Sequence, residues 1–408
     1  MKSTKAITLV ALIVTIVILL ILAGISINFI FGADGIFTKS KYAVEKYKKS
    51  QEDEQKMLNE VANYITDGYM VGGRGEAKTE MKKFGSTDVP IPGGFYYVGG
   101  NLDTGIVISD DKDDENKGDS FAIALNLKGN QFVWIPCKVT DGVDNEYKKS
   151  ETSGVETPQG VERTDVIAEN PLKDENYKNA VAKYGGFYVA RYEAGLATTT
   201  QRYTTGKKIW NDNVYNDIGK PLSKAKQIPW NYIDYPHAWA NSLNMYASTP
   251  TVVSSLITGT QWDVMLNVMK NKGKKFVNSE EVSMTENDIK IDSGAWGNYK
   301  NQTFSYTGEI AEYNNNGLSA FSAGNGTKSS GMYLLTTGAS ERTKIYNIFD
   351  VAGNLWEWTT ESKGSNRDRR GGCFVYDSNL YTGIYCAGDL GINTTSYDIG
   401  FRVVLYVL

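Results

Sequence analysis

The sequence predicts an α+β domain with a mostly antiparallel sheet, preceded by an apolar helix at the N-terminus. Short runs of aromatic and β-branched residues, bounded by glycine or proline, recur from residue 94 to the end of the chain and are typical of strands. Two stretches between them carry apolar residues at spacings of three and four, which indicates helices. Strands with a few helices and many loops favour the α+β class.

These elements can be placed along the chain by residue number. The expected strands are 94–98, 131–135, 186–192 and 401–405. The expected helices are 238–247 and 261–269. Polar, acidic stretches without an apolar period are interpreted as surface insertions, at 103–118 and 140–178.

Composition excludes several classes of function. The 408 residues include 43 Lys and Arg against 47 Asp and Glu, and the formal net charge is −4. No basic block is present that could follow a phosphate backbone, so we expect no nucleic-acid partner. The single histidine, His237, excludes a site with two imidazoles, and three dispersed cysteines are too few for a zinc thiolate cage or a disulfide framework.

The N-terminus predicts a membrane anchor. Ile7–Ile30 carries no charged residue, and a helix of this length crosses a bilayer core. Lys2 and Lys5 precede it, which predicts a cytoplasmic N-terminus and an exported remainder. A cleaved signal peptide would have a shorter apolar stretch. We therefore expect a single-pass protein of the cell membrane with an extracellular C-terminal domain, in which residues 1–35 form the leader and transmembrane helix.

Three further regions follow the anchor. Residues 36–67 are predicted to form an amphipathic stalk helix, because Met57 and Val61 recur at helical spacing among charged residues. Residues 68–88 have the glycine, lysine and serine content of a linker. The globular domain is expected to cover residues 89–408.

The extreme N-terminus resembles a known class of leader. The stretch Lys5-Ala6-Ile7-Thr8-Leu9-Val10 is similar to the start of type IV prepilins and pseudopilins, whose apolar helix is both anchor and assembly surface. Those families usually have a glycine before the cleavage point and a glutamate five residues beyond it, where this chain has Ala6 and Ala11. The resemblance implies a pilus-like assembly, and a plain signal anchor is the alternative with the same topology.

Six segments of the globular region together resemble a known family. They are Val89–Phe95, Tyr188–Glu193, Thr258–Asp263, Asp350–Trp358, Arg370–Gly372 and Ile399–Arg402. They occur in the order seen in the formylglycine-generating-enzyme, or sulfatase-modifying-factor, family. The resemblance covers about residues 89–408 and implies a C-type-lectin-like fold, which supports many functions.

One of these segments is a candidate metal site. Asp350 and Glu357 bracket a glycine turn whose carbonyls can face a hard cation. The resemblance implies a structural calcium ion, with side-chain oxygens from Asp350 and Glu357 and main-chain oxygens from Gly353 and Leu355. The alternative is a tight turn whose neighbouring tryptophans only fill the core.

The catalytic pattern of the family is not matched. Its chemistry depends on two cysteines shortly after an Arg-Gly-Gly-Ser motif, and copper bound by thiolates needs both sulfurs at one ion. Here Cys373 replaces the serine, and Tyr376 and Tyr381 stand where the pair is expected. Cys386 lies thirteen residues after Cys373. We therefore expect a protein that is not an enzyme; the alternative is an exported oxidase or related enzyme with an altered site. An exported domain permits a Cys373–Cys386 disulfide, which the spacing does not demand.

The segment 373–399 has a biased composition. It contains no Lys, Glu, Gln, Met or Trp, although the rest of the chain is rich in lysine and glutamate. Every residue type present has a codon ending in a pyrimidine, while the five missing types do not, as expected if the first two bases of asparagine codons were randomised. Chance in a glycine-rich loop is the alternative. The placement resembles the variable proteins of diversity-generating retroelements, whose C-type-lectin-like domain displays a mutated terminal segment as its binding surface.

This resemblance implies that the segment 373–399 binds an unidentified surface ligand, a protein or a glycan. Tyrosines supply contact area and small polar residues supply adaptable hydrogen bonds, as in antibody paratopes. A buried frame of Trp356, Trp358, Arg370 and Phe401 is expected to fix the ends of the segment. The candidate contact residues are Tyr376, Asp377, Asn379, Tyr381, Tyr385, Asp389, Asn393, Ser396 and Tyr397.

Overall fold

The computed structural model describes residues 78–137, 175–196, 219–277, 280–314, 317–363, 366–378 and 388–408. The chain separates into two compact units, Met1–Tyr64 and Ile65–Leu408, and every described residue belongs to the second. The predicted leader 1–35, with its membrane segment Ile7–Ile30, and the stalk 36–67 lie outside the described residues. Within the part of the chain that is described, no helix is long and apolar enough to cross a membrane.

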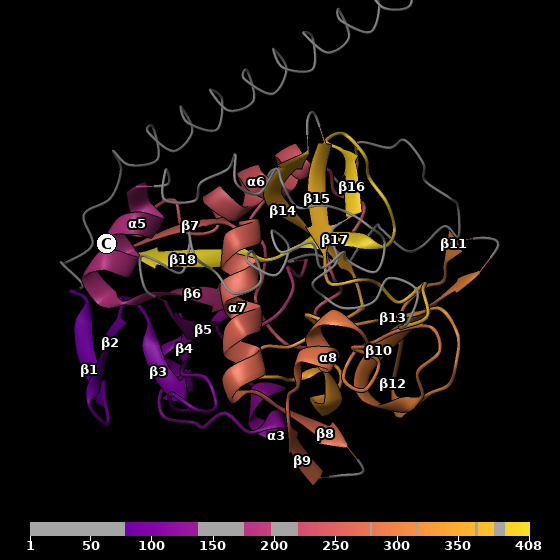
Figure 1. The fold of residues 1–408 in the computed structure, drawn as a ribbon, viewed down its shortest axis with the longest axis horizontal. Helices are drawn as coiled ribbons and strands as arrows, with labels where there is room; N and C mark the ends of the chain where they lie inside the picture. The colour runs from indigo at the N-terminus through magenta and orange to yellow at the C-terminus, as the bar shows by residue number, and fades with distance from the viewer. Residues whose placement is uncertain are drawn as a thin grey trace, which may run out of the picture. The chain divides into compact units, whose positions relative to one another are not determined.

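A six-stranded antiparallel sheet runs through the domain (Figure 1). Its strands, in spatial order, are β3 (Tyr96–Gly99), β4 (Val107–Ser109), β5 (Gln131–Pro136), β6 (Gly186–Ala190), β18 (Val403–Val407) and β7 (Val252–Leu256). The predicted α+β class is confirmed, and all four expected strands overlap strands of this sheet. Because β18 inserts between β6 and β7, the last residues of the chain lie in the interior of the sheet.

Both faces of this sheet are buried, because successive side chains alternate between two cores. On β5, Val133 and Ile135 join one core together with side chains of α7 (Gly259–Lys272), while Phe132 and Trp134 join the other. α7 crosses in front of the sheet in Figure 1. A strand buried on both faces appears in the sequence as a continuous apolar run, which is why β5 was predictable.

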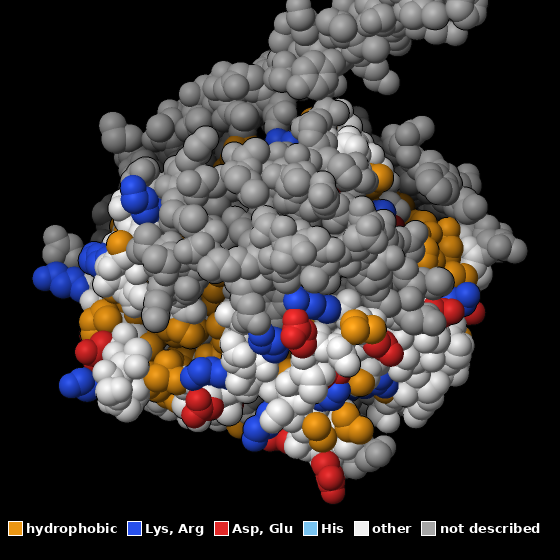
Figure 2. All heavy atoms as spheres, in the orientation of Figure 1, with side chains coloured by type: hydrophobic (Ala, Val, Ile, Leu, Met, Phe, Trp, Pro, Cys, Tyr) orange, Lys and Arg blue, Asp and Glu red, His pale blue; other side chains and the backbone are white. Residues whose placement is uncertain are grey.

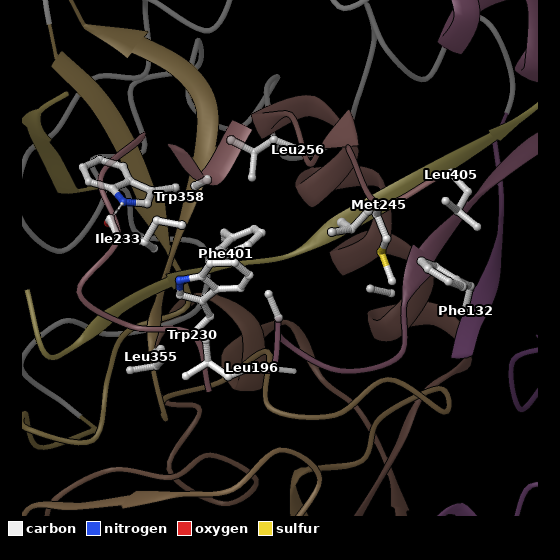
Figure 3. Close-up of a cluster of buried hydrophobic side chains, with 14 of the residues drawn as sticks. Phe132, Leu196, Trp230, Ile233, Met245, Leu256, Leu355, Trp358, Phe401 and Leu405 are labelled. Carbon is white, nitrogen blue, oxygen red and sulfur yellow. Dashed lines mark hydrogen bonds between the residues drawn. The ribbon is translucent and has the colours of Figure 1, made fainter. Parts of the chain in front are cut away.

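The second core joins the central sheet to a four-stranded sheet (Figure 3). The Trp230 and Phe401 rings pack edge to face with centroids 5.8 Å apart, and the Trp358 indole donates a hydrogen bond to the Ile233 carbonyl at 3.0 Å. The strands of the second sheet, in spatial order, are β16 (Gly388–Gly391), β15 (Asn366–Arg370), β14 (Trp356–Lys363) and β17 (Ile399–Phe401). β14 and β17 are parallel, and the other neighbours are antiparallel.

A third sheet lies beside the second. It consists of β10 (Phe304–Asn314), β11 (Gly317–Leu318), β12 (Ser322–Lys328) and β13 (Tyr333–Leu335), and β10 pairs with each of the other three. The other elements are two hairpins and several short helices. They are β1 (Glu80–Phe84), β2 (Thr87–Ile91), η1 (Lys112–Asp114), α3 (Phe121–Ala124), α5 (Glu175–Tyr184), α6 (Tyr235–Asn244), β8 (Lys274–Val277), β9 (Glu280–Ser283), α8 (Glu286–Lys290) and η6 (Glu341–Thr343).

Three of the predicted boundaries are wrong. The predicted linker 68–88 contains most of the β1–β2 hairpin, whose two strands meet at the turn Gly85-Ser86. β1 is almost entirely exposed, so it has no apolar alternation to read in the sequence. The predicted insertion 103–118 contains β4, a strand of only three residues, and α5 occupies the end of the predicted insertion 140–178.

Candidate binding surface

The C-terminal segment leaves β15 through two glycines. Gly371 and Gly372 have φ values of 97° and 76°, a region that residues with a side chain rarely adopt. The preceding residue, Arg370, is fully buried, and its guanidinium binds both carboxylate oxygens of Glu361 at 2.6 and 2.7 Å. The expected frame residues Trp356, Trp358, Arg370 and Phe401 are at most 2% exposed. The start of the segment is therefore fixed by a rigid, buried frame.

Residues 373–378, here called the first arm, run over the loop 298–302. The Lys300 amide donates to the Tyr376 carbonyl at 2.9 Å. The side chain of Asn301 accepts from the Ser378 amide at 3.1 Å and donates to the Ser378 hydroxyl at 3.3 Å. Gln302 donates to the same hydroxyl at 3.4 Å. Loop 298–302 therefore acts as the first support loop of the segment.

Residues 388–399, here called the second arm, rest on the loop 230–235. The Tyr232 amide donates to the Ser396 carbonyl at 2.9 Å, and the Asn231 side chain donates to the Tyr397 carbonyl at 2.7 Å. The carbonyl of Ile392 accepts from an amide of the same loop at 3.0 Å. Loop 230–235 is therefore the second support loop.

Most of these bonds end on main-chain carbonyls of the segment. A main-chain carbonyl is present whatever side chain the residue carries. The side chains at 376, 377, 393 and 396 are exposed or half-buried, so replacing them leaves the main-chain bonds in place. Of these four, Tyr376 also packs partly against the second core, and the Ser396 hydroxyl donates to Asp398. The segment is not replaceable throughout, since Cys373, Phe374, Ser378, Asp398 and Ile399 are buried.

The predicted contact residues fall into three groups. Tyr376, Asp377 and Ser396 are half-buried and Asn393 is exposed, and all four lie on the arms. Asn379, Tyr381 and Tyr385 lie outside the described residues, and Asp389 is placed in β16 with a side chain that is not described. Tyr397 is a different case, which the structure assigns to packing.

Tyr397 packs against the third sheet. Its ring stacks on that of Tyr313 in β10, with centroids 4.0 Å apart and an interplanar angle of 14°. The Phe374 ring of the first arm packs edge to face against the Tyr397 ring, with centroids 6.3 Å apart. Burial, followed by the hydrogen bond with Tyr313, raises the pKa of Tyr397. The ring therefore joins the two arms to β10.

Sequence reasoning missed Tyr313 and both support loops. Tyr313 lies 60 residues before the start of the segment at 373, both support loops lie further away along the chain, and no motif marks them. The sequence gives little indication of Tyr313, because this residue belongs to a polar stretch with no clear apolar run on either side. Figure 2 shows apolar side chains at the surface beside β11, which follows Tyr313.

Cys373 is unsuited to thiolate chemistry. It is a free, fully buried cysteine, and its thiol donates to Asp398 Oδ2 at 3.5 Å. Burial first, and then the Asp398 carboxylate, raises the pKa of Cys373 well above its usual range. A thiol that stays protonated at neutral pH is a poor nucleophile and a poor copper ligand. Cys386, with which an exported domain would permit a disulfide, lies outside the described residues.

The four residues of the predicted calcium site do not form an open ligand set. Asp350 accepts from the Gly338 amide at 2.6 Å and from the Thr343 hydroxyl at 2.8 Å. Both oxygens of Glu357 bind the Arg402 guanidinium, at 2.8 and 2.6 Å. Among the described residues, no three His, Cys, Asp or Glu side chains come together as metal ligands.

The turn 350–357 is accounted for by these protein contacts instead. Gly353 donates its amide to the Gly371 carbonyl at 2.8 Å, and Leu355 is buried in the second core. Because both carboxylates are engaged in this way, the residues do not fit a calcium ion. Calcium at this turn stays a prediction that these contacts do not favour.

Comparisons with known proteins add little. No family model matches the chain, and no curated protein matches it. Among solved structures, one that is similar is Treponema denticola variable protein 1, at 13% identity and a TM-score of 0.26, with 55% of this chain and 96% of that chain covered. A likeness of this size supports no conclusion about function.

Proposed function

We propose that this protein is a ligand-binding protein whose C-terminal segment, 373–399, is a replaceable recognition surface on a C-type-lectin-like domain. The observation that carries the proposal is the anchoring of both arms through main-chain carbonyls. The support loops hold Tyr376, Ile392, Ser396 and Tyr397 by atoms that every residue possesses. Such a surface can change its side chains while its backbone stays in place.

The buried thiol favours binding over catalysis. Cys373 is the cysteine nearest to the position of the family's catalytic pair, and its raised pKa keeps it protonated. An oxidase with an altered site would need another nucleophile. The half-buried tyrosine, aspartate and serine at 376, 377 and 396 suit contact with a ligand surface instead.

We further propose that the domain is displayed outside the cell. The uncharged run Ile7–Ile30 supports a single-pass anchor, and the prepilin-like start supports a pilus-like assembly. The ligand is then a protein or a glycan met at the cell surface. No nucleic-acid partner is proposed, because the chain has no basic block.

A pair of libraries in the full-length protein tests the recognition surface. The first randomises surface positions of the arms, at Tyr376, Asp377, Asn393 and Ser396. The second randomises residues that support the arms, at Asn231, Asn301, Tyr313 and Asn354; Asn354 is fully buried, and its carbonyl accepts from the Phe374 amide at 3.0 Å. We expect most variants of the first library to keep their stability within about 1 kcal/mol, and most of the second to lose more than that.

Both libraries are then selected against two unrelated purified proteins, lysozyme and serum albumin. The expected result is that the first library yields different variants for each target, each binding its own target only. Folded variants with no target-specific enrichment, or equal tolerance in the two libraries, would contradict the proposal. This experiment needs no knowledge of the natural ligand.

A further inference from the structure

A buried lysine lies directly beneath the first support loop. Lys328 is the last residue of β12 and is 1% exposed. Its ammonium donates to the carbonyl of Tyr299 at 2.7 Å and to that of Gln302 at 2.8 Å. The rings of Phe304 and Tyr333 lie 5.4 and 5.9 Å from the same nitrogen. One side chain thus bridges both ends of the sequence 299–302.

The loop that Lys328 bridges is the one that carries the first arm. Between the two bonded carbonyls lie Lys300, whose amide holds the Tyr376 carbonyl, and Asn301, whose side chain holds Ser378. Any displacement of 299–302 is therefore transmitted to the arm through at least these two contacts. Apolar packing alone cannot fix two carbonyls that point inward, because each needs a donor.

We propose that Lys328 is a positioning residue for the recognition surface: its buried ammonium fixes the first support loop, and through it the first arm. The proposal rests on the proposed function for the role of the arm, but its geometry stands without a ligand. A neutral apolar side chain of the same length would fill the space but remove the donor to the Gln302 carbonyl, and the Tyr299 carbonyl would keep only the Gln302 amide, at 3.2 Å. Removing one partner of a buried hydrogen bond costs more than the bond contributes.

The electrostatic surroundings make this contact sensitive to pH. The charged and titratable side chains that face Lys328 are Arg342 from η6 and Tyr333 from β13. Burial first, and then Arg342, lowers the pKa of Lys328 to about 8. Above that pH the ammonium releases its proton, and a neutral amine is the weaker donor to two carbonyls. We expect the first arm to loosen in mildly alkaline solution.

Amide hydrogen exchange in the full-length protein tests this inference. Lys328→Met should lower the protection of the Lys300 and Ser378 amides by about tenfold or more, because both depend on the first support loop. The Tyr232 amide, which holds the second arm, should keep its protection. The matched control is Lys300→Met, which removes an exposed lysine side chain from the same loop. This variant should leave the protection of the residue-300 and Ser378 amides unchanged.

The pH series gives a second, independent result. After correction for the intrinsic rate, protection of the Lys300 and Ser378 amides in the natural sequence should fall as the pH rises past about 8. In Lys328→Met this fall should be absent.

Equal protection in Lys328→Met and Lys300→Met would overturn the positioning role. If Lys328→Met also exposes the Tyr232 amide, the variant has unfolded more widely, and the pH series of the natural sequence decides. Unchanged protection across that series then rejects the proposal. A failed library selection would leave these outcomes intact, so the failure of the proposed function and the failure of this inference are distinguishable.

Discussion

At the scale of single residues, buried charges hold the frame beneath the binding surface. Glu193, Asp350 and Glu357 are all buried, and desolvation is the largest cause that raises the pKa of each carboxyl. Glu357 is compensated by the bidentate Arg402 pair. Glu193 has fewer partners: one oxygen accepts from Asn354, and the other has no hydrogen-bond partner among the described residues. Glu193 is therefore the electrostatically costly member of the three.

Glu193→Gln should stabilise the protein near neutral pH. Because the folded-state pKa of Glu193 lies above its ordinary value of 4.5, the native state keeps a proton that the unfolded state has released, and the free energy of unfolding falls as pH rises through that window. The glutamine side chain does not ionise, so the variant avoids this loss. We expect its free energy of unfolding to be higher by about 1 kcal/mol or more at about pH 7.5. The gain should shrink at about pH 4.5, where the carboxyl in the unfolded state is itself about half protonated.

Urea unfolding at the two pH values measures this difference. Glu312→Gln, at an exposed side chain of β10, is the control and should change stability by less than about 0.5 kcal/mol at either pH. A Glu193→Gln variant that is less stable than the natural sequence at both pH values would show that the carboxylate is stabilised by its surroundings.

At the scale of elements, α7 links the central sheet to the frame. The helix begins with a capping box, in which the Thr258 hydroxyl accepts from the Gln261 amide at 3.1 Å and Gln261 Oε1 accepts from the Thr258 amide at 2.9 Å. The first turn then buries Trp262 in the core and places Asp263 within 3.7 Å of Arg370. The cap therefore fixes a helix end that contacts the base of the segment.

Thr258→Ala should destabilise the protein by about 1 kcal/mol, because two amides at the start of α7 lose their partners or their geometry. Chemical denaturation measures the change. Thr327→Ala on the exposed strand β12 is the matched control, for which we expect a change within about 0.5 kcal/mol. If the two variants behave alike, the cap does not hold the helix end.

At the scale of the whole molecule, three distant parts of the chain meet under one segment. Loop 230–235, loop 298–302 and Tyr313 all contact residues 374–397. The segment therefore joins the second sheet, through β15 and β16, to the third sheet, through Tyr313. Its backbone depends on the correct assembly of the entire domain.

A metal ion that held this assembly together would raise its global stability. A bound ion stabilises the native state by an amount that grows with its concentration over its dissociation constant. The Glu357–Arg402 pair and the two donors to Asp350 lead us to expect no such gain from calcium. The unfolding temperature in about 1 mM calcium should equal that in excess chelator. An increase of several degrees with calcium alone, and not with magnesium, would restore the predicted site.

The sequence was sufficient where structure follows from local pattern. The apolar runs 131–135 and 186–192 predicted β5 and β6, and the spacing in 261–269 predicted α7, because burial on one or both faces leaves a period in the sequence. Exposed strands such as β1 leave no such period, and they were missed. The buried frame residues were also predictable, since a run of tryptophan and glycine at 353–358 has few uses outside a tight, packed turn.

What the sequence alone determined is the α+β class, the position of its main strands along the chain and the segment 373–399 as a region of unusual composition. Only the tertiary structure decided which carboxylate meets which partner, that Tyr397 packs on Tyr313, and that main-chain bonds hold both arms. These contacts join residues tens to hundreds of positions apart, and each depends on the relative placement of whole sheets. No local pattern of side chains encodes such placement, because it results from packing of the complete core.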